Sequence, residues 1–204
     1  MEKKQQKQLI TYARGKIRAF FDAHPSPGHG FHHAVRTAQF GKLIARFEKQ
    51  NIFLAELAGL LHDIGYLRYT HGSSKSHHEH SYELAREWFR KDVSFNILTR
   101  NEKIIVLYSL RYHGNDDANL YQTAWILRDA DKLDGLGIVG LKRSRDYCSY
   151  SGQSPNVDLR LRFHIAAYLK SEWSKNLLKN KKLLKPFQLT LAKNNRASIK
   201  PIKL

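Results

Sequence analysis

Four residues combine metal-ligand chemistry with helical spacing: His33, the adjacent pair His62 and Asp63, and Asp131. In a helix over residues 31–49, His33 shares a stripe with apolar side chains at steps of three and four, and such a stripe faces the core. His62 and Asp131 continue comparable stripes in two later segments. A buried carboxylate without a partner is costly. We therefore expect two imidazoles and two carboxylates from three helices to share one cation.

The order of these residues along the chain is more informative than any of them alone. A histidine within FHHAVRT (31–37) is followed by the pair within LLHDIG (60–65) and by an aspartate within LRDADKLDGLG (127–137). With these segments in this order, the chain resembles the HD-domain superfamily of metal-dependent phosphohydrolases. The last segment is particularly similar to a bacterial subgroup of small nucleotide-directed members. The resemblance covers roughly residues 9–168 and implies an all-α helical bundle.

The matching motif positions imply a set of metal ligands: His33, His62, Asp63 and Asp131. His32 is an alternative first ligand, although the helical stripe favours His33. Imidazoles and carboxylates suit Mn, Mg, Co, Ni, Zn or Fe rather than a thiophilic metal. A divalent metal here would polarise a phosphoryl oxygen and generate the nucleophile from bound water. Asp63 could also accept a hydrogen bond from that water and orient or deprotonate it.

Two further histidines, His80 and His113, lie between the His–Asp pair and Asp131. Their order resembles HD proteins that bind a second metal, so second-metal ligation is one hypothesis. With a single metal, the same rings would bind substrate phosphates or protonate the leaving oxygen. A purely structural role is the third possibility, and His78 is an alternative to His80.

Two basic residues follow the expected ligands and are candidates for binding a phosphate. Arg36 lies three residues after His33 on nearly the same helix face, so its guanidinium could clamp a phosphate bidentately. The alternative is a surface arginine near the rim of the pocket. Lys132 directly follows Asp131 and is the weaker candidate of the two.

Most other histidines need no functional explanation. His24 and His29 lie in a segment rich in proline and glycine, and His71 and His77 lie in or beside a polar loop. We expect all four to face solvent. His164 is expected to be a packed or capping residue of the last helix.

The elements that must position these residues are predicted to be helical nearly throughout. Capping-box spacing at residues 76–79 and 99–102 marks two helix starts, and Asp158 is expected to cap the last long helix. Past Pro186, alternating apolar residues at 187, 189 and 191 suggest a short strand or an extended arm. The prediction is an all-α HD-type domain over residues 1–175 and a basic C-terminal arm over 176–204. The expected helices span about 9–23, 31–49, 54–65, 76–90, 99–113, 120–133 and 158–173, and residues 135–154 are expected to be a mixed segment.

The net charge of +17 is concentrated at the two ends of the chain. Residues 170–204 carry +9 and residues 1–18 carry +5, which leaves only +3 for the remainder. Such ends attract polyanions without sequence specificity, so non-specific contact with nucleic acid is one hypothesis. A solvated tail that promotes solubility is the favoured alternative.

Composition and cysteine usage favour a cytoplasmic protein. No uncharged apolar run approaches the roughly 20 residues that a membrane span needs, and the charged first residues are unlike a secretory signal. Cys148 is the only cysteine and so cannot form an internal disulfide, which suits a reducing compartment.

The leading functional hypothesis is metal-dependent hydrolysis of a phosphate ester or anhydride in a nucleotide-like small molecule. Two alternatives from other classes are kept. Some HD proteins are di-iron oxygenases with six His and Asp ligands, and this chain offers six candidates. An HD module that binds nucleotides or nucleic acid without turnover is the third hypothesis.

Overall fold

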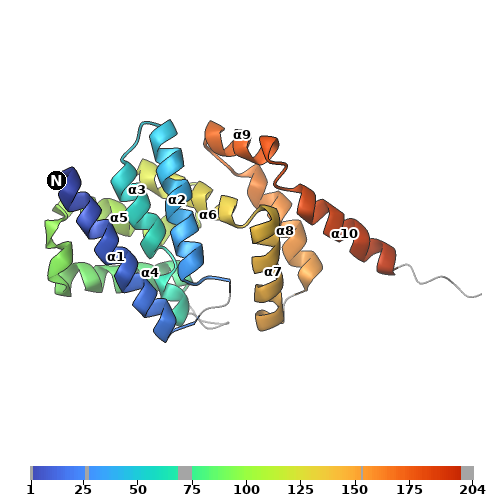
Figure 1. Ribbon diagram of the computed structural model, residues 1–204, viewed down its shortest axis with the longest axis horizontal. Helices are drawn as coiled ribbons and strands as arrows, with labels where there is room; N and C mark the ends of the chain where they lie inside the picture. The colour runs from blue at the N-terminus through green and yellow to red at the C-terminus, as the bar shows by residue number, and fades with distance from the viewer. Residues whose placement is uncertain (1, 26–27, 69–74, 153, 199–204) are drawn as a thin grey trace, which may run out of the picture.

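The computed structural model describes residues 2–25, 28–68, 75–152 and 154–198 (Figure 1). These residues form ten α-helices and two short 3-10 helices, with no strand among them, which confirms the all-α prediction. The predicted role of His71 lies outside the described residues. The helices are α1 (Lys3–Ala23), α2 (Phe31–Phe47), α3 (Ile52–Leu61), α4 (His77–Lys91), α5 (Arg100–Tyr112), α6 (Gln122–Asp134), α7 (Gly137–Ser151), α8 (Pro155–Ala167), α9 (Glu172–Asn180) and α10 (Lys185–Ser198), and the 3-10 helices are η1 (Ile64–Arg68) and η2 (Val93–Ile97).

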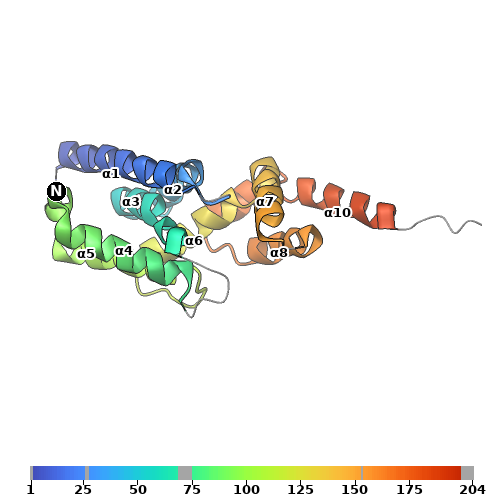
Figure 2. The ribbon, with the colours of Figure 1, turned by 90° about the horizontal axis from the view of Figure 1, so that it is seen from below.

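The chain builds two hydrophobic cores that meet at α6. Figures 1 and 2 show α6 between the group α1–α5 and the group α7–α10. The first core gathers apolar side chains from α1, α3, α4 and α5, and the second gathers those of α6, α8 and the C-terminal helices. Helix α3 is apolar around nearly its whole circumference and is buried accordingly. Helices α2, α3 and α6 pack against one another. His33 lies on α2 and Asp131 on α6, and His62 and Asp63 directly follow α3.

The helix starts predicted from capping boxes are correct. At α5, Thr99 Oγ1 accepts from the backbone N–H of Glu102 at 3.2 Å, and the Glu102 carboxylate accepts from the backbone N–H of Thr99 at 2.8 Å. At α4, Ser76 Oγ accepts from the backbone N–H of Glu79 at 3.3 Å. The Glu79 carboxylate accepts from Arg111 Nε at 2.6 Å rather than from the backbone N–H of Ser76, so only half of the capping box forms.

The expected extended arm is helical, and the strand prediction for residues 187–191 is wrong. Leu184, Phe187 and Leu191 follow steps of three and four and pack into the second core, where Phe187 is fully buried. Leu189 belongs to another face of α10 and is 61% exposed. The domain boundary expected after residue 175 falls inside α9.

Three further expectations for the C-terminal half are corrected. His164, expected to be a packed or capping residue, is exposed on α8. The mixed segment expected over 135–154 is largely the helix α7. Asp158 does not cap α8, because that helix begins at Pro155, a residue preorganised for the first helical turn. The buried Asp158 carboxylate instead accepts hydrogen bonds from Ser144 and Arg162. Among the described residues, no helix combines the length and apolar character needed to cross a membrane.

Candidate metal centre

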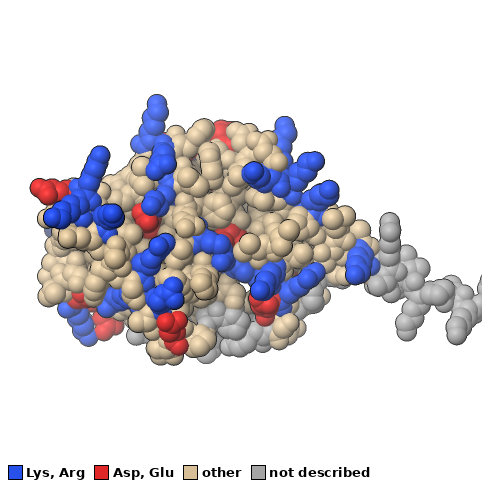
Figure 3. All heavy atoms as spheres, in the orientation of Figure 1, with Lys and Arg blue, Asp and Glu red and all other residues tan. Residues whose placement is uncertain are grey.

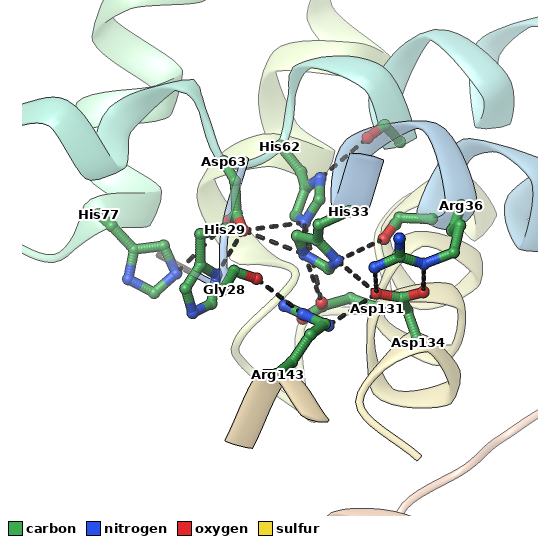
Figure 4. A network of polar contacts seen from close by, with 12 residues as sticks. Gly28, His29, His33, Arg36, His62, Asp63, His77, Asp131, Asp134 and Arg143 are labelled. Atoms are coloured by element: carbon green, nitrogen blue, oxygen red, sulfur yellow. Dashed lines mark hydrogen bonds and ion pairs between the residues drawn. The ribbon is translucent and has the colours of Figure 1, made fainter. Parts of the chain in front are cut away.

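Two imidazoles face each other at the centre of the site. His33 lies in the first turn of α2 and His62 directly follows α3, and their Nε2 atoms are 3.0 Å apart (Figure 4). His62 Nδ1 donates to the Gly59 carbonyl at 2.9 Å, and His33 Nδ1 donates to Asp134 at 2.7 Å. Because Nδ1 of each ring carries the hydrogen, each neutral ring directs the lone pair of Nε2 at the other. Two lone pairs held this close require a proton or a cation between them.

Two carboxylates complete this arrangement. Asp63 Oδ2 lies 3.2 Å from His33 Nε2 and 3.3 Å from His62 Nε2. Asp131 Oδ1, from α6, lies 3.2 Å from His33 Nε2 and 3.8 Å from His62 Nε2. All four residues predicted to ligate a metal therefore converge, from three segments separated in sequence.

The charges in this cluster fit a divalent cation. Burial raises the pKa of Asp63 and Asp131, but contacts with the neighbouring histidines lower it further, so both pKa values lie well below their usual range. Burial lowers the pKa of His62, but Asp63 and Asp131 raise it more, to about 10. The negative charges of the buried Asp63 and the partly exposed Asp131 thus attract positive charge to the point between the rings. A mixed nitrogen and oxygen donor set suits a divalent metal of borderline hardness.

A second group of imidazoles borders the first. His113 directly follows α5, and its ring lies 5.3 Å from that of His62 and 4.2 Å from that of His78. Ligand atoms of His77, His78 and His113 all lie within 4.8 Å of one another, and the same holds for His62, Asp63 and His113. The structure therefore brings His113 to the site, as expected.

His80 is not part of this group. Its Nδ1 lies 3.6 Å from Glu83 Oε2, and none of the candidate ligand groups among the described residues includes it. Helix α4 begins at His77, so His78 occupies its first turn and His80 points about 200° around the axis from His78. His78, the alternative that the sequence left open, is the residue that lies beside His113. A catalytic role for His80 stays a prediction.

The expectation that His29 and His77 face solvent is wrong. His29 Nδ1 lies 2.8 Å from Asp63 Oδ2, and its side chain is only 20% exposed. Its ring stacks on Tyr66 at 3.9 Å, and Tyr66 stacks on His77 at 4.1 Å. Burial lowers the pKa of His77 and of His78 to about 3. One sequence signal was present, because His29 lies four residues before His33, but its Pro/Gly surroundings obscured it.

The two predicted phosphate binders are both engaged with aspartates. Arg36 donates from Nε to Asp134 Oδ1 at 2.6 Å and from Nη2 to Oδ2 at 3.0 Å, so its fork is already occupied. Arg143, from α7, donates to the same carboxylate at 2.7 Å. Lys132 Nζ lies 2.6 Å from Asp116. Asp134 and Arg143 are site residues that the sequence interpretation missed, whereas phosphate binding by Arg36 and Lys132 stays a prediction.

A cavity of about 300 Å³ opens beside Asp131. Its wall includes Lys132, together with Arg143 and Arg162 from α7 and α8. Tyr66 and Tyr147 add aromatic surface. Basic side chains next to a candidate metal site, with aromatic rings on the same wall, suit a phosphorylated ligand with a planar ring.

The arrangement of one histidine, a His–Asp pair and a later aspartate agrees with comparison to known proteins. The sequence pattern of the HD domain matches residues 30–136. The chain belongs to the HD-domain family.

Relatives of this HD-domain protein include the uncharacterized protein YpgQ of Bacillus subtilis strain 168, which is 26% identical over 156 residues, covering 74% of this chain and 70% of that protein. The crystal structure of B. subtilis YpgQ in complex with ADP has a TM-score of 0.73 at 18% identity, over 97% of this chain and 98% of that one. An HD-superfamily hydrolase from Bacillus thuringiensis has a TM-score of 0.67 at 20% identity, over 94% and 99% of the two chains. These structures share the fold, and the resemblance predicted from the motifs is confirmed.

Proposed function

We propose that this protein is a divalent-metal-dependent phosphohydrolase that cleaves a phosphate ester or anhydride of a nucleotide-like molecule. The observation that carries the proposal is the convergence of His33 Nε2 and His62 Nε2 with the carboxylates of Asp63 and Asp131. Membership of the HD-domain family supports hydrolysis. The ADP bound to B. subtilis YpgQ supports a nucleotide ligand.

The four residues at the centre would hold the metal, and their partners keep them in place. A divalent metal bound there supplies Lewis-acid polarisation of a phosphoryl oxygen and lowers the pKa of water. His33 and His62 present Nε2 because Asp134 and the Gly59 carbonyl accept from their Nδ1 atoms. Hydrogen bonds to the second nitrogen commonly orient metal-binding histidines in this way.

Asp63 is the residue best placed to orient or deprotonate an attacking water. Oδ2 of Asp63 is close to His29, His33 and His62. Oδ1 is turned toward His77, whose Nε2 is 3.9 Å away. The three imidazoles around Oδ2 fix the plane of the carboxylate, so the direction in which Oδ1 accepts a proton is set before substrate binds.

The chemistry of His113 favours metal ligation over phosphate binding. Its Nδ1 donates to the Leu110 carbonyl at 2.9 Å, so the neutral ring offers only a lone pair at Nε2. A phosphate oxygen is an acceptor and would need a protonated Nε2, yet burial lowers the pKa of His113 to about 4. We therefore assign His113, with His77 and His78, to a second cation rather than to the substrate.

The substrate is proposed to bind in the cavity beside Asp131. Lys132, Arg143 and Arg162 would hold phosphate oxygens, and Tyr66 and Tyr147 would contact the planar base. Arg143 is held in place by donating to Asp134 and to the Gly28 carbonyl, each at 2.7 Å. A preorganised guanidinium loses less conformational entropy when it binds an anion.

Phosphate release from ADP and a panel of other nucleotides, with Mn²⁺ added to protein purified without chelators, tests the proposal. We expect turnover that Asp131→Asn abolishes and that Asp117→Asn, an exposed aspartate used as a matched control, retains. Iron bound in pairs with oxygen consumption and no phosphate release would contradict hydrolysis and identify an oxygenase. Nucleotide binding without any turnover would identify a binding module.

A further inference from the structure

A second and larger cavity contains none of the expected metal ligands, although Arg36 and Asp134 at its edge also border the metal centre. It has a volume of about 810 Å³ and is bordered by α2, the α6–α7 junction, α9 and the start of α10. We call it the apolar groove, because its walls are mainly aliphatic and aromatic. The apolar side chains used in the argument below are Phe40, Leu133, Leu136, Val139, Leu183 and Leu189.

The walls of the apolar groove are fixed by the fold. At its floor, Leu133 and Leu136 belong to the second core and are 2% and 3% exposed. The loop between α9 and α10 is tied to α7, since the Gly137 N–H donates to the Leu183 carbonyl at 2.9 Å. Gly137 has φ +68°, and a Cβ there would meet Leu183 at 3.3 Å. The fully buried Phe187 anchors the first turns of α10.

The rim of the apolar groove leaves large apolar side chains in contact with water. Ile138 is 77% exposed, Leu189 is 61% exposed and Val139 is 47% exposed. These residues come from α7 and α10, and all three line the same cavity. A contiguous exposed apolar surface around a cavity of this size is typical of a ligand site.

The charged residues around the apolar groove determine whether an anionic or a cationic ligand is favoured. Lys181, Lys182, Lys185 and Arg36 line it, and Asp134 is the one acidic residue among its described lining residues. The Asp134 charge is already compensated by two arginines. Figure 3 shows Lys and Arg side chains over the end of α9 and the start of α10. An anionic group is therefore favoured, and a second copy of this chain would bring the same lysines into repulsion.

We propose that the apolar groove binds a free long-chain fatty acid, with its hydrocarbon chain on the apolar walls and its carboxylate at the lysines. The cavity volume lies within the range of small-molecule sites, and apolar walls with a few placed charges are how such sites recognise a ligand. The proposal does not require phosphohydrolase activity, because the groove contains none of the expected metal ligands and meets the metal centre only through Arg36 and Asp134.

Isothermal titration calorimetry of the full chain with dodecanoate, kept below its micelle concentration, tests the proposal. We expect saturable binding near one per chain with a negative heat-capacity change. Dodecyltrimethylammonium, which has the same chain and a positive headgroup, should bind at least tenfold more weakly. Equal affinity for the two amphiphiles, or no binding of dodecanoate, would overturn the proposal.

Three variants locate the binding. Val139→Trp fills the apolar groove and Lys181→Glu/Lys185→Glu reverses its rim charge, and each should weaken dodecanoate binding at least tenfold. Lys3→Glu/Lys4→Glu changes the net charge equally on exposed residues at the far end of the molecule and should stay within twofold (Figure 1). Unchanged thermal melting confirms that each variant is folded. Retained binding in Val139→Trp, or binding only to anionic phospholipid vesicles, would refute a fatty-acid site.

Discussion

Replacing Asp134 with asparagine removes a buried charge that joins His33 to two arginines while it keeps the shape of the side chain. The carboxylate contacts His33 Nδ1 at 2.7 Å, Arg36 Nε at 2.6 Å and Arg143 Nη1 at 2.7 Å, and its side chain is 1% exposed. Burial raises the pKa of Asp134, but hydrogen bonds from His33 and Arg36 lower it further, from 3.8 to about 2.

This pKa difference sets the expected loss of stability. Because the pKa is lower in the folded protein, the stabilisation is fully present above pH 4 and is lost as the pH falls toward 2. At about 1.4 kcal/mol per pH unit, it amounts to roughly 2–3 kcal/mol at pH 7. Asp134→Asn should therefore lower the free energy of unfolding in urea by about that amount. Metal affinity should also fall, by about ten- to a hundredfold, because His33 loses its orienting partner.

The matched control is Asp146→Asn, which changes an exposed aspartate on the neighbouring helix α7. It should alter the free energy of unfolding by less than about 0.5 kcal/mol and leave metal affinity unchanged. If Asp134→Asn behaves like this control in both assays, Asp134 does not hold His33, and the account of the site is incorrect.

Three other substitutions test the roles assigned to His78, Asp92 and Phe187. His78→Ala should lower phosphate release at least tenfold in steady-state kinetics with Mn²⁺, whereas His80→Ala should stay within twofold. Burial raises the pKa of Asp92, but hydrogen bonds, chiefly from Lys16, lower it to about 2. The charged Asp92 therefore stabilises the fold by about 1 kcal/mol above pH 4, and this stabilisation is lost as the pH falls toward 2. In urea unfolding, Asp92→Asn should lose less stability between pH 4 and pH 2 than the unchanged protein. Phe187→Ala should lower the free energy of unfolding by about 3–5 kcal/mol in the same assay, because it empties a fully buried site.

These three predictions have their own controls and contradicting results. Phe47→Ala changes a phenylalanine that is 53% exposed and should have little effect on stability. An equally small effect of Phe187→Ala would show that α10 is a peripheral arm. Asp22→Asn is the exposed control for Asp92→Asn, and identical acid unfolding of the two variants would remove the assigned role of Asp92. Equal losses in His78→Ala and His80→Ala would contradict the placement of α4.

The central ligands could be predicted because their positions follow from local periodicity. His33, Thr37 and Ile44 are all buried, as their shared stripe required, and Asp131 lies on the corresponding face of α6. Periodicity acts within one helix and is independent of the rest of the chain. Phe47 shows its limit, since this last residue of α2 is exposed although it continues the stripe.

The rest of the site depends on contacts between distant segments. His29 precedes α2 and reaches Asp63 only because its loop folds back over η1, where its ring stacks on Tyr66. Arg143 lies in a segment expected to be mixed, and its partner Asp134 becomes visible only when α6 and α7 are placed together. A capping signal locates the start of α4 but does not determine which face turns toward a neighbour, so the sequence leaves the choice between His78 and His80 open.

Metal content per chain, measured on protein purified without chelators, tests the central claim most directly when it is combined with single-residue variants. We predict one or two divalent ions per chain in the unchanged protein and in His164→Ala, which alters an exposed histidine. We predict loss of at least one ion in both His62→Ala and Asp131→Asn, with folding retained. Full metal content in these two variants, or no metal in the unchanged protein after incubation with Mn²⁺, would contradict the assignment of this cluster as a metal centre.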